Sequence, residues 1–155
     1  MTEAPAQPRF TGFEDLFSRD LLGASDWVLI DQPLIDRFAD VTGDRQWIHT
    51  DPRRARRDSP YGATIAHGAL TLSLCLTFLE EVLSVEGVTY MVNGGFDRVR
   101  FQAPVLAGSR IRGQVRLRDA RRMGAGARVV VRTTVEIAGE KRPACVADHV
   151  LVLQG

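Results

Sequence analysis

The apolar run HGALTLSLCLTFLEEVL, at residues 67–83, decides the fold of this chain. Its leucines, Cys75 and Phe78 fall on nearly every side of the helix that the run predicts. A helix without a clear polar face is typical of a buried position, because each of its sides must be covered by other apolar groups. We therefore expect the rest of the chain to pack around this segment.

The C-terminal half changes from helical spacing to alternation. Apolar residues occupy every second position of 111–117 and of 129–137, which is the period of a β-strand. Residues 88–100 and 144–153 are further strand candidates, and glycine-containing turns at 124–126 and 138–140 favour hairpins. Antiparallel strands and one buried helix pack most simply as a curved sheet wrapped around the helix, so the sequence predicts an α+β domain.

The segment before the buried helix combines short elements with a long connection. Residues 26–30 predict a strand, and apolar spacing over residues 32–42 predicts a helix that ends at Gly43. Residues 44–64 contain two prolines and a glycine and predict mostly loop, with a short helix after Asp51 and Pro52. A connection of this length is usually functional.

Composition limits the classes of protein to consider. With 155 residues, 20 basic and 19 acidic side chains, the chain is expected to form one domain over 10–155 after a disordered lead-in at 1–9. A net charge of +1 argues against a dedicated nucleic-acid or membrane-surface protein. The two cysteines, Cys75 and Cys145, lie in apolar runs and predict buried reduced thiols, and no leader or membrane-spanning stretch is evident. A cytoplasmic protein is expected.

Residues that carry chemistry cluster in the long connection. It reads Gly43-Asp44-Arg45-Gln46-Trp47-Ile48-His49-Thr50-Asp51 and later Ile65-Ala66-His67-Gly68. An Asp and a His five residues apart can converge on one water, and Gly68 opens the buried helix with an unobstructed backbone N–H. These are the groups needed to move a proton and to stabilise an oxyanion.

Each of these residues also has a purely structural explanation. Asp44 could cap or turn the chain after Gly43, and His49 could be a packed histidine bonded to a backbone carbonyl. We expect a structural role for His67 at the helix start, and a core or interface position without chemistry for His149. No metal site is expected, because the three histidines fall in unrelated sequence contexts.

The motif resembles the single hot-dog (R)-specific enoyl-CoA hydratases and MaoC-like dehydratases. Their pattern is Gly-Asp-x-Asn-Pro-x-His-x-Asp, followed by Ile-(Ala/Val)-His-Gly and a small residue or serine further along the helix. The matching residues here are Gly43-Asp44, His49, Asp51, Ile65-Ala66-His67-Gly68 and Ser73, and Val99-Arg100-Phe101-x-Ala103-Pro104-Val105 is similar to the strand and turn after the helix. The resemblance extends from about Trp27 to the C-terminus. Gln46 and Trp47 replace Asn and Pro, as in the nodulation-protein-N-like branch. The Trp47 indole is either a hydrophobic anchor under the loop or a wall of the acyl channel, and we favour the channel.

The resemblance implies a hot-dog fold and reversible addition of water to a trans-2-enoyl-CoA, giving a (3R)-hydroxyacyl-CoA. Asp44 and His49 would hold the water, and the Gly68 N–H would bind the thioester oxygen. The candidate substrate-binding residues are Gln46, Trp47, Ser73 and Arg100. Coenzyme A is part of the substrate, so no separate cofactor is expected, and arginine side chains suit its phosphates. A homodimer joined edge to edge is also implied, and residues 144–153, apolar on both faces, favour it.

Two other functions share these features. A hot-dog thioesterase would use the same helix-start N–H with an acid that attacks or activates water at the carbonyl, but the His paired with Asp44 favours a hydratase. A non-catalytic acyl-thioester-binding protein would keep the fold without turnover, and retention of both Asp44 and His49 argues against it. The carrier is either coenzyme A or an acyl-carrier protein.

Overall fold

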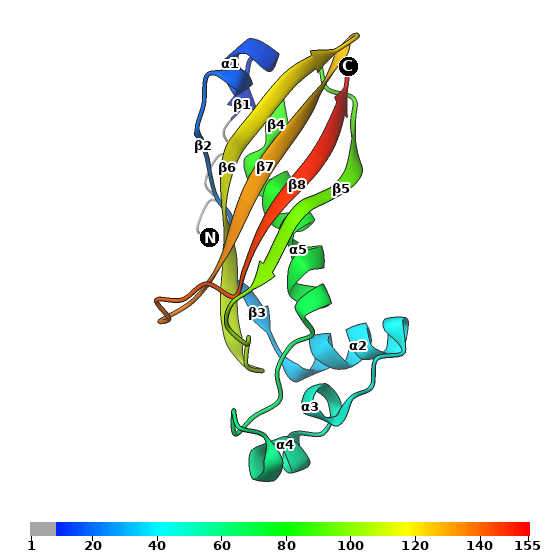
Figure 1. Cartoon of the computed structure of the whole chain (residues 1–155), viewed down its shortest axis with the longest axis vertical. Coiled ribbons are helices and arrows are strands. Elements are labelled where there is room, and N and C mark those ends of the chain that lie inside the picture. Colours follow the sequence, from blue (N-terminus) through cyan, green and yellow to red (C-terminus); the bar gives the residue numbers. More distant parts are fainter. Residues whose placement is uncertain (1–8) are drawn as a thin grey trace, which may run out of the picture.

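A curved antiparallel sheet wraps around one long helix in the computed structural model, which describes residues 9–155 (Figure 1). The sheet has the strand order β2-β6-β7-β8-β5, and β3 also pairs with β6. This arrangement confirms the predicted α+β, hot-dog architecture. The strands are β2 (Leu21–Ala24), β3 (Val28–Ile30), β5 (Tyr90–Phe101), β6 (Ser109–Met123), β7 (Gly126–Ile137) and β8 (Cys145–Gln154).

Helix α5 (Gly68–Val82) lies against the inner face of this sheet, as its composition predicts. Phe78 and Leu79 are fully buried, and the sheet approaches Phe78 closely at Gly113. A Cβ atom at position 113 would lie 2.7 Å from the Cβ of Phe78, so only glycine allows this approach. The helix is not covered on every side, however, because the sheet wraps only part of it, and Ala69, Ser73 and Thr77 are exposed.

The last strand, β8, is an interior strand. It pairs with β7 on one side and with β5 on the other, so its backbone has no free edge. Its inner face contributes Cys145, Ala147, Leu151 and Leu153 to the core. The available edge on this side of the sheet therefore belongs to β5, and an edge-to-edge contact predicted from β8 would have to use β5 instead.

Three of the helices that precede α5 gather at its N-terminal end (Figure 1): α2 (Gln32–Thr42), α3 (Trp47–Thr50) and α4 (Pro52–Asp58). The bounds of α2 agree with the prediction, since Asp31 caps its start through the Leu34 N–H and Gly43 ends it with a φ of 79°. The helix expected after Asp51 is α4. Helix α3, which contains both Trp47 and His49, was not predicted, because residues 44–50 were expected to form a loop.

The N-terminal elements are short. Strand β1 (Arg9–Phe10) pairs in parallel with β4 (Ser84–Val85), and α1 (Phe13–Phe17) follows. Arg9 was expected in the lead-in but already belongs to β1, and residues 1–8 of that lead-in lie outside the described residues. The strand expected from residue 26 begins at Val28.

Both cysteines are buried free thiols, as predicted. Burial raises the pKa of Cys75 to about 12 and that of Cys145 to about 11, because a thiolate is poorly solvated in an apolar interior. Both thiols are therefore protonated and unreactive at neutral pH. Within residues 9–155, no helix has the length and apolar content needed to cross a bilayer.

Candidate active site

Asp44 lies in the connection between α2 and α3, directly after the turn at Gly43. Its side chain is 55% exposed, and its Oδ1 accepts the Gln46 N–H at 3.4 Å. This hydrogen bond gives Asp44 the turn-stabilising role expected of a structural residue. It occupies only one lone-pair position of the carboxylate. The remaining positions can accept hydrogen bonds from water or substrate.

His49 is buried in α3 with a defined tautomer. Its Nδ1 lies 2.7 Å from the carbonyl oxygen of Ile65, 16 residues further along the chain. A carbonyl oxygen can only accept, so Nδ1 must carry the hydrogen, and the neutral ring then has its lone pair on Nε2. The backbone bond expected of a structural histidine thus leaves the other ring nitrogen ready to accept a proton.

His67, the residue before α5, contacts both Asp44 and His49. Its Nε2 lies 2.9 Å from the backbone oxygen of Asp44 and donates to it, and its ring stacks on His49 with centroids 3.8 Å apart. The Phe38 ring also packs against the His67 ring, tilted by 50° and with centroids 5.1 Å apart. The structure therefore corrects the expectation that the histidines lie in unrelated contexts, since His49 and His67 are neighbours.

One nitrogen or oxygen atom from each of Asp44, His49 and His67 falls in a group whose members all lie within 4.8 Å of one another. This proximity raises the question of a metal. The two rings are stacked 25° from parallel with centroids 3.8 Å apart, so their lone pairs lie in separate, nearly parallel planes and do not converge on one ion. Because His67 Nε2 is also occupied by the Asp44 carbonyl, the geometry suits proton transfer better than chelation.

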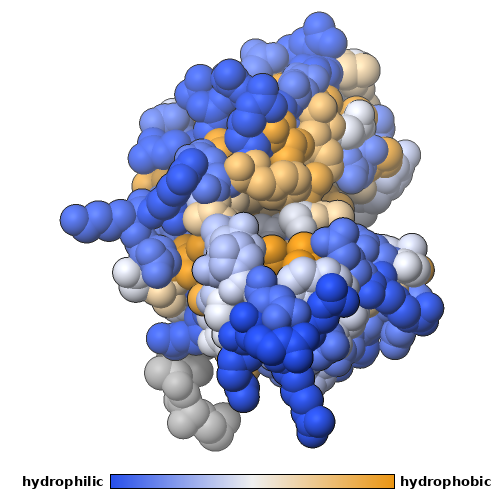
Figure 2. Space-filling view, turned by 60° about the horizontal axis from the view of Figure 1, so that its bottom comes forward, coloured by the Kyte–Doolittle hydropathy of each residue, from blue (hydrophilic) through white to orange (hydrophobic). Residues whose placement is uncertain are grey.

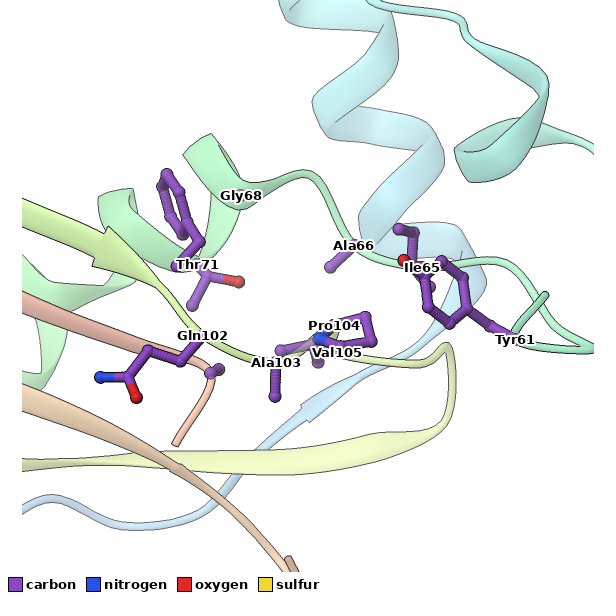
Figure 3. A pocket seen from close by; sticks show the side chains of 11 residues that line it. Tyr61, Ile65, Ala66, Gly68, Thr71, Gln102, Ala103, Pro104 and Val105 are labelled. Atoms are coloured by element: carbon purple, nitrogen blue, oxygen red, sulfur yellow. The ribbon is translucent and has the colours of Figure 1, made fainter. Parts of the chain in front are cut away.

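Gly68 begins α5 and faces a cavity of about 370 Å³ (Figure 3). As the first residue of the helix, it has an N–H without an intrahelical acceptor, at the positive end of the helix dipole. A Cβ at this position would lie 3.1 Å from the ring of Phe101, so glycine keeps the approach open. The cavity is lined by Tyr61, Ile65, Ala66, Gly68, Thr71, Phe101, Gln102, Ala103, Pro104, Val105 and Ala144.

Asp44 and His49 do not line this cavity in the single chain. They lie beside it, across residues 65–67: His49 bonds to the Ile65 carbonyl, and the His67 ring donates to the Asp44 carbonyl. From the end of the molecule that carries α2, α3 and α4, apolar side chains surround a hollow and hydrophilic side chains project around it (Figure 2). Such a surface suits a ligand with an apolar part and a charged part.

The four candidate substrate-binding residues lie outside the cavity lining. Gln46 precedes α3, where its carbonyl accepts the His49 N–H at 2.9 Å, and Trp47 stacks against the Arg54 guanidinium at 4.4 Å. Ser73 is exposed and donates to its own helix at the Ala69 carbonyl, 2.7 Å away. Arg100 is exposed on the edge strand β5.

Other residues at the site had no signal in the sequence. Thr71 and Phe101 line the cavity, although Phe101 lies in the segment that carries the family resemblance. Gln32, the first residue of α2, reaches the His49 carbonyl with its side-chain amide. A glutamine at the start of an amphipathic helix looks like any surface residue, and only its distant partners distinguish it.

Comparison with known proteins identifies similar chains. A family model described as MaoC like domain matches residues 20–140. The 3-hydroxyacyl-thioester dehydratase Z of Mycobacterium tuberculosis (strain ATCC 25618 / H37Rv) is 46% identical over 131 residues, which cover 84% of this chain and 86% of that protein. Nodulation protein N of Rhizobium leguminosarum bv. viciae is 45% identical over 135 residues, covering 86% of this chain and 84% of that protein.

Solved structures agree in fold. The MaoC-like dehydratase from Rhodospirillum rubrum superposes with a TM-score of 0.73 at 20% identity, over 92% of this chain and 96% of that one. The R-hydratase PhaJ1 from Pseudomonas aeruginosa superposes with a TM-score of 0.66 at 22% identity, over 85% of this chain and 81% of that one.

Proposed function

This chain belongs to the MaoC-like dehydratase family, and from that premise we propose that it is an (R)-specific enoyl-thioester hydratase. It adds water reversibly to a trans-2-enoyl-CoA and forms a (3R)-hydroxyacyl-CoA. The similarity to a 3-hydroxyacyl-thioester dehydratase supports this reaction, since an enzyme that accelerates dehydration also accelerates hydration. The observation that carries the proposal is the proximity of a His49 ring nitrogen to an oxygen of the exposed Asp44 carboxylate, with His49 Nδ1 bonded to the Ile65 carbonyl.

These two groups can hold one water between them. An Asp44 oxygen and a His49 nitrogen lie within 4.8 Å, a separation that a bridging water spans with one hydrogen bond to each. One of the two acceptors removes a proton from this water as its oxygen bonds to the β-carbon. The pair then returns a proton to the α-carbon, so that the net change is the addition of one water.

The barrier to this reaction is the negative charge that develops on the thioester oxygen. The Gly68 N–H at the start of α5 is the donor that we assign to this oxygen, because the helix dipole and the absence of a Cβ both favour an anion there. The adjacent cavity would receive the thioester. The arginines of α4, which include Arg53 and Arg56, are exposed at the same end of the molecule and suit coenzyme A phosphates.

We also propose a homodimer in the cytoplasm that serves fatty acid metabolism. Strand β5 is an edge with exposed Tyr90, Val92 and Phe101, and an unpaired edge of this kind pairs readily with a second copy. Such pairing would bring a second chain next to Phe101 and therefore next to the cavity. The two free thiols agree with a reducing compartment. Light scattering at micromolar concentration should give the mass of two chains, and a fully active monomer would exclude the dimer.

The reaction is tested with the purified protein and crotonyl-CoA. We expect loss of the enoyl absorbance and formation of (3R)-hydroxybutyryl-CoA, identified by chiral chromatography. Release of free coenzyme A, measured with a thiol reagent, would instead indicate a thioesterase. Saturable binding of the thioester without either product would indicate an acyl-thioester-binding protein.

A further inference from the structure

We propose that Gln32 is a positioning residue for His49, which it serves by joining the two backbone segments that hold the imidazole. The inference rests on the proposed function, because it assigns His49 a catalytic role. Gln32 itself does not touch the reacting atoms. It acts through the His49 backbone and through Thr64.

The side-chain amide of Gln32 makes three hydrogen bonds. Its Nε2 donates to the His49 carbonyl at 2.7 Å and to Asp36 Oδ1 at 2.8 Å, and its Oε1 accepts the hydroxyl of Thr64. The carbonyl of His49 can only accept, so the amide orientation follows from the contacts. Gln32 therefore spans 17 residues to reach His49 and 32 residues to reach Thr64.

These partners belong to the segments that determine the His49 tautomer. Thr64 is 2% exposed and directly precedes Ile65, whose carbonyl receives the His49 Nδ1–H. The Ile65 N–H in turn donates to the carbonyl of Ile48 at 3.0 Å. Residues 48–49 and 64–65 are thus connected directly by two hydrogen bonds and a third time through Gln32.

This connection has a chemical consequence. If the two segments separate, Nδ1–H loses its acceptor, and the ring is free to rotate or to place its hydrogen on Nε2. A hydrogen on Nε2 would remove the lone pair that the proposed reaction uses. Gln32 therefore keeps the base in its active form as well as in its place.

Starting the helix does not require this side chain. Asp31 caps α2 by accepting the Leu34 N–H at 2.9 Å, so the start of the helix is satisfied without Gln32. Fixing a glutamine costs rotamer freedom that an ordinary surface residue keeps. The three simultaneous contacts to separate parts of the chain explain why the Gln32 side chain is held in one conformation.

The test uses four variants of the full-length protein. Gln32→Met removes both hydrogen-bonding groups at nearly the same length, and Thr64→Val replaces only the hydroxyl. Thr64→Ser restores the hydroxyl, and Asp36→Asn alters the third partner of Gln32 without touching the bond to His49. Crotonyl-CoA hydration gives kcat and KM over a pH series, and ¹⁵N chemical shifts of the His49 ring give its tautomer.

We expect Gln32→Met and Thr64→Val to lower kcat by about 10- to 100-fold, the size of effect that a small misplacement of a catalytic group produces. KM should change by less than about threefold, because the cavity lining is intact. The His49 nitrogens should shift towards a mixture of tautomers in both variants. Thr64→Ser and Asp36→Asn should behave like the parent protein.

Unchanged kcat in Gln32→Met and Thr64→Val would overturn the inference. So would a loss of activity with the His49 tautomer unaltered, because the effect would then be general destabilisation. Full activity of His49→Gln would instead refute the proposed function. In that case the ¹⁵N shifts still decide whether Gln32 positions the ring.

Discussion

The imidazole rings of His49 and His67 stack on each other, with their centroids 3.8 Å apart and their planes 25° from parallel. His67 also donates a hydrogen bond to the backbone carbonyl of Asp44, so one side chain supports both members of the proposed acid–base pair. His67 is the residue that precedes α5, and Gly68, the proposed oxyanion donor, follows it directly. Asp44, His49 and the Gly68 N–H are therefore all held at the start of a single helix, α5.

Substitution of the acid–base pair is expected to separate catalysis from folding. Asp44→Asn and His49→Gln should each lower the hydration rate by about 10²- to 10⁴-fold, the usual contribution of a positioned acid or base. Asp44 is more than half exposed, so its variant should keep the parent melting temperature. Crotonyl-CoA turnover and circular dichroism measure the two effects. Near-parent turnover in either folded variant would remove that residue from the mechanism.

Two contributions of His67, its aromatic ring and its hydrogen-bond donor, can be tested separately. His67→Phe keeps an aromatic ring against His49 and Phe38 but cannot donate to the Asp44 carbonyl. We expect kcat to fall about tenfold or more with little change in melting temperature, because the Asp44 loop loses its attachment while water solvates the freed carbonyl. His67→Ala should also lose stability, since it empties a buried site. Equal kcat in His67→Phe and the parent would mean that the hydrogen bond does not position Asp44.

Gly68→Ala tests the opening beside the helix start. The added methyl would lie 3.1 Å from the Phe101 ring, which is 54% exposed and therefore able to move. We expect KM to rise as the ring shifts against the cavity, while the melting temperature stays close to the parent value because alanine favours helices. The double variant with Phe101→Leu should lose less than the two single variants combined. Strictly additive effects would show that the ring and the methyl do not interfere.

Trp47 is expected to act as an anchor rather than as a wall of the acyl channel. Its ring packs under Arg54 and does not line the cavity, which argues against the substrate-binding role considered for it. Trp47→Ala should lower the melting temperature and reduce activity on short and long enoyl-CoAs alike. Arg54→Ala removes the cation–π partner together with an exposed ion pair to Asp58 at 3.6 Å, and it should cost about 0.5–1 kcal/mol of stability. A changed preference between chain lengths in Trp47→Ala would restore the channel role.

His149 predicts a pH dependence of stability. It is fully buried on β8, with Nε2 2.9 Å from Asn93 Oδ1 and Nδ1 without a hydrogen-bond partner among residues 9–155. Burial lowers the pKa of His149 below 6.5, because the charged ring is poorly solvated there. The unfolded chain therefore binds a proton that the folded chain does not, and the free energy of unfolding should fall as the pH drops below 6.5.

The matched comparison is His149→Gln, which keeps an amide near Asn93 but does not titrate. Urea unfolding at a series of pH values should give a smaller loss of stability between neutral and acidic pH for this variant than for the parent protein. Parallel curves would show that groups other than His149 account for the whole dependence.

Local patterns were enough to predict much of this protein. The apolar run at residues 67–83 predicted α5, and the apolar spacing over residues 32–42 with Gly43 predicted the bounds of α2. Alternation predicted the long strands, because side chains in a strand point to opposite faces at every second residue. The family motif, recognised by residue type and spacing, named Asp44, His49 and Gly68 before any distance was known.

Tertiary structure decided how those residues are held. His49 meets Ile65 across 16 residues, His67 meets Asp44 across 23, and Gln32 meets Thr64 across 32. It also decided that β8 is interior and β5 is the edge. Periodicity and capping reflect the sterics of neighbouring residues, whereas contacts between distant segments depend on how the helices and the sheet pack. For this reason the sequence predicts candidate catalytic groups, and only the packed chain determines their orientation and their protonated atoms.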